Sequence, residues 1–279
     1  MDLTLIESIP PWDWPRNAGE MFARILRDRQ SAPSERLLAA SLAGSTVVLD
    51  EQMVELLLSL VQDHSEPDEL RATAAISVGP ILEATDMEGF DEDFSEPPIS
   101  RATFELIGAT FRRLHDSPDT PKLVRRRILE ASVRCTAEWH PDAIRTAYDG
   151  GDEEWRLTAV FCMGYVRGFD AEILKMLESQ DSEVHHAAVV AAGRWGLSAA
   201  WRHVRGLLRA GTEKQLLLAA MGAAACIAPK KAVKLLQELA RSHDQDIADA
   251  ANEARLDAQF GDDPVQEDED PYEGQRYVQ

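Results

Sequence analysis

Apolar residues recur along most of the chain at the three- and four-residue spacing of an amphipathic helix. In the segment 199–209, for example, Trp201, Val204 and Leu208 fall on one face, and charged residues occupy the opposite face. Similar segments follow one another along the sequence with turn residues between them. The pattern predicts amphipathic helices over 17–28, 51–61, 100–114, 142–148, 171–177, 199–209 and 231–241.

A second motif recurs between these helices and predicts that they come in pairs. Residues 36–44 and 71–79 share an arginine, an Ala-Ala pair and a glycine at an offset of 35 residues. Later copies begin at Val124, Trp155 and Val184, with offsets of 31 and 29 residues. A single pair of such short helices cannot bury both of its faces, so we expect successive pairs to stack around a continuous core.

The repeated unit resembles the HEAT repeat, in particular its short bacterial form, the PBS-lyase HEAT-like repeat. Its shared features are an apolar residue or Trp, a following Arg, and small residues that end in Gly, and they cover residues 33–259. The resemblance implies an all-α fold, an α-solenoid (α/α superhelix) of about six to seven HEAT-like helix pairs. Members of this group include phycobilin lyase subunits, hydroxylases, DNA glycosylase relatives and scaffolds, so the resemblance fixes no function.

Segments that break the repeat define the expected domain organisation. We expect an N-terminal capping segment over 1–32, a solenoid over 33–260 with an acidic insertion at 83–98, and a disordered acidic tail over 261–279. Prolines keep residues 10–15 extended, so that Trp12 and Trp14 point the same way. These tryptophans either cover the open end of the first repeat or form an exposed aromatic docking motif.

The charge balance narrows the range of partners. The chain of 279 residues has 29 Lys and Arg against 49 Asp and Glu, a formal net charge of −20. A surface this acidic repels phosphate, which disfavours nucleic acid and anionic membranes as partners. The sequence has neither a basic signal region nor a membrane-length apolar run, and we expect a cytoplasmic protein. Cys135, Cys162 and Cys226 are interpreted as reduced thiols in the core.

Basic residues of the last two repeats form one candidate binding surface. They recur at helical spacing and superpose between the two repeats at an offset of 32 residues. They are either a solvated polar face or an anion-accepting groove for an acidic segment of a partner, and the resemblance places them on the concave side of the solenoid. The tail 261–279 would compete for such a groove. The candidate residues are Arg202, Arg205, Arg209, Lys230, Lys234 and Arg241.

Arginines at one position of the repeat form a second series, called the arginine ladder below. We interpret the ladder as structural, because the resemblance implies that each arginine pairs with an acidic turn residue of a neighbouring repeat. Its members are Arg36, Arg71, Arg125 and Arg156.

The sequence contains no recognisable catalytic set. It lacks HExxH, the His-Glu dyads that bind iron in HEAT-like hydroxylases, and the GxGxxG, GxSxG and Walker motifs. Its acidic insertion does not have the glycine spacing of an EF-hand. We therefore expect no catalytic residue, metal or cofactor, and a non-catalytic protein-interaction scaffold or adaptor that binds another protein. The alternative, which the resemblance implies, is an accessory subunit or lyase-like protein acting on a chromophore or modified protein.

Overall fold

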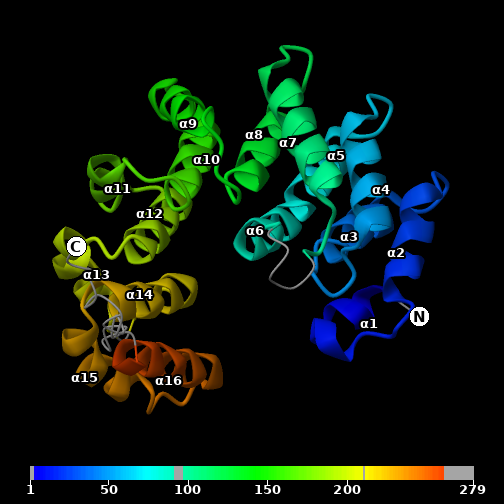
Figure 1. Cartoon of the computed structure of the whole chain (residues 1–279). Helices are drawn as coiled ribbons and strands as arrows, with labels where there is room; N and C mark the ends of the chain where they lie inside the picture. Colours follow the sequence, from blue (N-terminus) through cyan, green and yellow to red (C-terminus); the bar gives the residue numbers. More distant parts are fainter. Residues whose placement is uncertain (1–2, 91–96, 210, 261–279) are drawn as a thin grey trace, which may run out of the picture. The chain divides into compact units, whose positions relative to one another are not determined.

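A computed structural model describes residues 3–90, 97–209 and 211–260 (Figure 1). Over these ranges the fold is all-helical, without a strand, and its helix pairs stack as in an α-solenoid, which confirms the predicted fold class. The chain divides into two compact units, Met1–Val166 and Arg167–Gln279, which are described separately. None of the helices in the described ranges combines the length and apolar character needed to cross a membrane.

The first unit stacks four helix layers on its N-terminal segment. We call the helices that carry the repeat motif the inner helices. In this unit they are neighbours in the order α3, α5, α8 and α10, and the other, outer helices pack beside them. The helices are α1 (Leu3–Glu7), α2 (Ala18–Arg27), α3 (Pro33–Leu42), α4 (Glu51–Gln62), α5 (Asp68–Ser77), α6 (Gly79–Glu88), α7 (Arg101–Asp116), α8 (Lys122–Ser132), α9 (His140–Asp149) and α10 (Glu153–Met163), with a short 3-10 helix at Pro11–Asp13.

The second unit repeats the same layering, with α12, α14 and α16 as its inner neighbours. Small residues let these helices approach closely, and Ala188, Ala192, Ala220 and Ala224 are fully buried. The helices are α11 (Asp170–Met176), α12 (Ser182–Arg194), α13 (Trp201–Leu207), α14 (Lys214–Ile227), α15 (Pro229–Leu239) and α16 (Gln245–Phe260), with a 3-10 helix at Ser198–Ala200.

Side-chain caps explain where several inner helices begin. The carboxylates of Asp152, Asp181 and Asp244 accept hydrogen bonds from backbone N–H groups one turn ahead, as is typical of an aspartate just before a helix. Ser34, the second residue of α3, does not cap this helix. Pro33 occupies the first helical position, because its fixed φ suits a helix start, and the cap residue is Ala32.

The acidic insertion begins later than the sequence predicts. Residues 83–88 belong to α6, which ends at Gly89 with a φ of +71°. The helix continues because Leu82 and Thr85 are buried on its inner face, while Glu83 forms a 2.7 Å ion pair with Arg134 of the next repeat. Residues 91–96 of the insertion and the whole acidic tail lie outside the described residues.

The three cysteines are free thiols, but only one is buried in the core. Cys162 is buried as predicted, whereas Cys135 is half-buried and Cys226 is exposed. Cys226 lies on the exposed face of α14 together with Gly222, one turn earlier. The prediction that it is buried is wrong, because its apolar neighbours in the sequence lie on the other face of the helix. Burial raises the pKa of Cys162 and that of Cys135, the latter to about 11, and partial desolvation raises that of the Cys226 thiol. All three are therefore protonated and weakly nucleophilic at neutral pH.

Ion pairs between neighbouring repeats recur at a spacing of 30 residues. Arg36 contacts Glu66 at 2.6 Å, Lys122 contacts Asp152 at 2.6 Å, and Lys214 contacts Asp244 at 2.9 Å. In each pair the cation comes from one inner helix and the carboxylate lies just before the next inner helix. The repeat therefore contains a fixed polar link as well as its apolar core.

Candidate binding site

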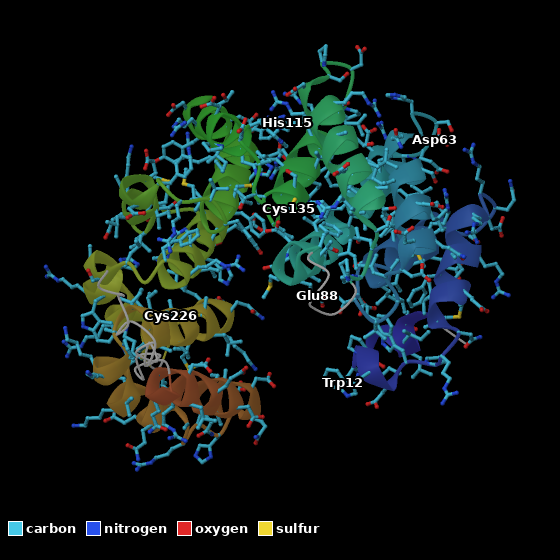
Figure 2. All side chains as sticks on the ribbon, viewed as in Figure 1. Trp12, Asp63, Glu88, His115, Cys135 and Cys226 are labelled. Atoms are coloured by element: carbon cyan, nitrogen blue, oxygen red, sulfur yellow. The ribbon has the colours of Figure 1, made fainter. Side chains whose placement is uncertain are left out.

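The two N-terminal tryptophans occupy different environments. The indole N–H of Trp14 donates to the carbonyl oxygens of Ile6 and Ile9 at 3.0 and 3.1 Å, and its ring packs edge-on against Phe22. Trp12 is 77% exposed and lies at the end of the first unit opposite His115 (Figure 2). Trp14 thus stabilises the N-terminal segment, and Trp12 alone is presented to solvent.

The candidate basic residues are all exposed, but they do not form one continuous helical stripe. Helix α13 ends at Leu207 and α15 ends at Leu239, so Arg209 and Arg241 follow their helices rather than lie on them. Helices α13 and α15 each pack against α14. Within the described ranges, Arg202, Arg205 and Lys234 form no ion pair.

Three ladder arginines share a contact that the sequence did not predict. Each donates to a backbone carbonyl ten residues earlier, in the last turn of the preceding helix. The last carbonyls of a helix have no partner within the helix and carry its negative dipole end, so a guanidinium satisfies and stabilises them. The pairs are Arg36 with Leu26, Arg71 with Val61 and Arg125 with His115, at 2.8, 3.0 and 3.0 Å. Arg156 is half-buried in α10.

The ladder arginines differ in what lies on their other side. Arg36 also contacts the buried carboxylate of Glu66, thirty residues later, at 2.6 Å. Arg125 has Trp155 thirty residues later, and its guanidinium carbon lies 5.7 Å from the centre of the indole ring. Arg125 thus has an indole beside it and no carboxylate partner among the described residues, and a pocket of about 420 Å³ opens there.

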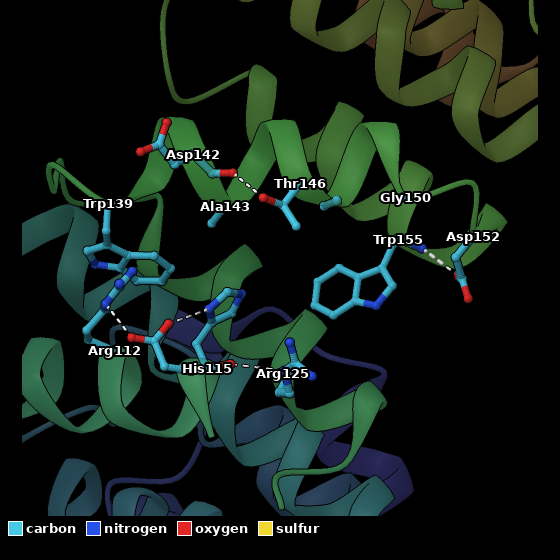
Figure 3. Close-up of a pocket in the computed structure, with 12 residues that line it drawn as sticks. Arg112, His115, Arg125, Trp139, Asp142, Ala143, Thr146, Gly150, Asp152 and Trp155 are labelled. Carbon is cyan, nitrogen blue, oxygen red and sulfur yellow. Dashed lines mark hydrogen bonds and ion pairs between the residues drawn. The ribbon is translucent and has the colours of Figure 1, made fainter. Parts of the chain in front are cut away.

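The pocket lies between α7, α9 and the start of α10 in the first unit (Figure 3). The indoles of Trp139 and Trp155 flank the imidazole of His115, at ring-centre distances of 5.0 and 6.2 Å. Ala143 and Gly150 are small and leave room on the side of α9. The full lining is Arg112, His115, Asp116, Arg125, Trp139, Asp142, Ala143, Thr146, Ala147, Gly150, Asp152 and Trp155.

The carboxylates that line the pocket are each matched by a nearby cation. Asp116 pairs with Arg112 at 2.7 Å, Asp142 with Arg145 at 3.0 Å, and Asp152 with Lys122 at 2.6 Å. The hydrogen bond from Lys122 holds the pKa of Asp152 below its usual value, which keeps this carboxylate charged. Arg125 is the lining cation without a carboxylate partner among the described residues.

Two histidines at the pocket are neutral at pH 7. Burial lowers the pKa of His115, although its 3.5 Å contact with Asp116 opposes the shift. Burial also lowers the pKa of His140 to about 4, with further contributions from the charges of His115 and Arg112. His140 accepts a hydrogen bond from the backbone N–H of Ala137 at Nδ1, so its proton is on Nε2. The site therefore combines aromatic surfaces, neutral imidazole and one unpaired guanidinium.

Sequence reasoning missed most of this site. It singled out Arg125, but as part of the ladder, and it treated Trp155 only as the apolar residue that begins a repeat. The available signal was local: Trp139 and Trp155 are 16 residues apart, at the start of successive helices, and follow a segment rich in arginine. Within the described residues there is no group of three or more His, Cys, Asp or Glu that could hold a metal ion.

Comparisons with known proteins show that the fold of this chain resembles several solved structures. No family model matches the chain, and neither does any curated protein sequence. One similar solved structure is the complex of CpcE and CpcF of phycocyanin lyase from Nostoc sp. PCC7120, with 15% identity over 90% of this chain and 98% of that one, and a TM-score of 0.44. Another is human deoxyhypusine hydroxylase, with 13% identity over 86% and 84% of the two chains, and a TM-score of 0.41. Both are HEAT-like repeat proteins.

These likenesses correct one prediction. We expected that the chain is not an enzyme. That exclusion is wrong, because proteins of similar fold include a lyase and a hydroxylase. At such low identity the comparisons concern the fold alone, so they assign neither a reaction nor a substrate.

Proposed function

We propose that the chain binds another protein and that the pocket between Trp139 and Trp155 receives a planar aromatic group of that partner. The observation that carries this proposal is the arrangement of the two indoles on either side of His115. Such surfaces favour aromatic rings in offset or edge-on contact. Tryptophan, tyrosine and arginine are also the residues that most often dominate binding energy at protein interfaces.

The cations beside the rings support the same function. The guanidinium of Arg112 lies 4.9 Å from the centre of the Trp139 ring, and that of Arg125 lies 5.7 Å from the Trp155 ring. These contacts hold the indoles in place before any ligand arrives, and a preorganised pocket loses less entropy on binding. A neutral His115 offers the ligand a polar contact, and because the imidazole has no charge, binding does not require a charged group to lose its water.

A single substitution inside the pocket tests this proposal. In Ala143→Arg a long side chain fills the space on the α9 side while the tryptophans stay in place. Ala102→Arg is the matched control, since Ala102 is an exposed residue of α7 outside the pocket lining. We expect the Ala143→Arg protein to lose its partner in affinity purification from native cells, and the control to retain it. The same partners on both variants would contradict the proposal.

The planar group is either an aromatic side chain or a chromophore attached to the partner. The second case corresponds to an accessory or lyase-like role. Absorbance spectra of the purified complex separate the two, because a conjugated chromophore absorbs in the visible range and protein side chains do not.

The exposed basic residues of the second unit are proposed as a second contact, for an acidic segment of the partner. Arg202, Arg205 and Lys234 have no carboxylate partner among the described residues, so their charges are available. Changing these three residues to Glu is expected to weaken the complex and to reduce its salt sensitivity. If the tail 261–279 competes for this surface, its deletion strengthens binding, and an unchanged affinity would rule out that competition.

A further inference from the structure

We infer that the group bound between Trp139 and Trp155 carries a carboxylate and that Arg125 is its receptor. This inference rests on the proposed function, because it takes the pocket as the binding site of a planar group. The ligand class is therefore a planar aromatic ring with a carboxylate close to it.

The pair of Arg36 and Glu66 shows what an arginine at the ladder position can bind. Arg36 uses one terminal nitrogen for the carbonyl of Leu26 at 2.8 Å and the other for the carboxylate of Glu66 at 2.6 Å. Arg125 keeps the first contact, through Nε and the carbonyl of His115. The position that corresponds to Glu66 in the next repeat, five residues before the ladder arginine, is Gly151, which has no side chain to supply the second contact.

The anchored guanidinium of Arg125 is suited to a carboxylate. Its Nε is held by the carbonyl of His115, which fixes the plane of the group. Its two terminal nitrogens have no hydrogen-bond partner within the part of the chain that the structure describes. A planar guanidinium with two free N–H-bearing nitrogens binds a carboxylate through two parallel hydrogen bonds.

The neighbouring charges do not supply this carboxylate. Asp116, Asp142 and Asp152 are each held by another cation, Arg112, Arg145 and Lys122 respectively. An anionic ligand therefore completes a charge pair at Arg125 without breaking an existing one. Because Trp155 lies beside Arg125, the ring of the ligand packs against the indole while its carboxylate meets the guanidinium.

Two pairs of probes that differ only in this charge test the inference on the full chain. They are N-acetyltryptophan with N-acetyltryptophanamide, and the peptide acetyl-Gly-Gly-Trp as free acid with the same peptide as C-terminal amide. In calorimetric titrations we expect each acid to bind about tenfold more tightly than its amide, as a charge-assisted contact predicts. Equal binding of acid and amide would overturn the inference and leave the aromatic pocket intact. Absence of binding by all four probes would overturn the pocket function as well.

Two variants locate the effect at Arg125. In Arg125→Gln the preference for the acid over the amide is expected to disappear. Trp155→Glu places a carboxylate beside Arg125, so the acid should bind more weakly than the amide in this variant. An acid preference that survives in both variants would contradict the assignment.

The same titrations distinguish two sources of the carboxylate. If the peptide acid binds more than tenfold more tightly than N-acetyltryptophan, the ligand is the C-terminal residue of a chain. If the two acids bind equally, the ring and the carboxylate suffice, and a free aromatic acid is the ligand. Both results support the carboxylate receptor.

Discussion

The Nε atom of Arg125 donates a 3.0 Å hydrogen bond to the carbonyl oxygen of His115 and so repeats the contact between Arg71 and Val61. Each of these bonds joins an inner helix to the last turn of the outer helix before it. The ladder position is therefore a cap that locks one helix pair to the next. Arg125 serves this structural role and, in our proposal, a binding role with its other nitrogens.

The pair of Arg36 and Glu66 provides the first prediction. Both side chains are buried, so Arg36→Leu leaves the Glu66 carboxylate with only the exposed Arg29, at 3.5 Å. We expect this variant to lose about 3 kcal/mol of unfolding free energy in urea, and the double variant with Glu66→Leu to lose clearly less. Arg29→Leu is the control, because Arg29 is 60% exposed and solvent screens its pairs with Asp63 and Glu66, so its removal should change stability little. Equal losses in the single and double variants would show that the carbonyl contact, rather than the buried charge, dominates.

The fold could be predicted from the sequence because small and apolar residues repeat where inner helices meet. Ala39, Ala75 and Ala188 are fully buried, as their place in the repeat indicates. The site could not, because its chemistry depends on a contact between residues thirty positions apart. Nothing local to Trp155 shows that it packs beside an arginine of the preceding repeat. Only the stacked layers bring Arg125 and Trp155 together.

The buried His140 predicts a loss of stability in acid. Its pKa is lowered from 6.5 to about 4 in the folded chain, so the unfolded state binds the proton more tightly. Stability is therefore fully present above pH 6.5, falls as the pH drops below that value, and has lost about 3 kcal/mol near pH 4. His140→Asn keeps an acceptor for the N–H of Ala137 and should remove this part of the pH dependence. Urea unfolding at a series of pH values measures it, and identical slopes for both proteins would contradict the assignment.

A histidine pair in the second unit predicts two opposite pKa changes. The Nε2 atoms of His185 and His203 lie 2.7 Å apart, and Glu178 lies 3.4 Å from the other nitrogen of His203. Burial and then the charge of His203 lower the pKa of His185, whereas the charge of Glu178 raises it. An NMR titration should thus show a higher pKa for His185 in His203→Gln and a lower one in Glu178→Gln. Shifts of the same sign in both variants would exclude this electrostatic explanation.

Two glycines of neighbouring inner helices predict opposite effects of the same substitution. A Cβ atom at Gly193 of α12 would lie 2.6 Å from the Cα atom of Ala223 in α14, a backbone contact that no rotamer change relieves. Gly193→Ala therefore forces the helices apart, and we expect a loss of about 1–3 kcal/mol. Gly222 of α14 is exposed, and a Cβ atom added there would meet no atom within 4 Å, so Gly222→Ala should add about 0.5–1 kcal/mol through helix propensity.

Thermal unfolding of the two glycine variants beside the unmodified chain measures this difference. Because the substitution is the same in both, a change in opposite directions can come only from the environment of each glycine. Close approach of α12 and α14 is what aligns one repeat on the next in this unit. If Gly193→Ala were as stable as Gly222→Ala, the helices would have to be farther apart than the fully buried Ala192 and Ala224 indicate. The repeat would then rely on its polar links, such as the 2.9 Å pair of Lys214 and Asp244, for its register.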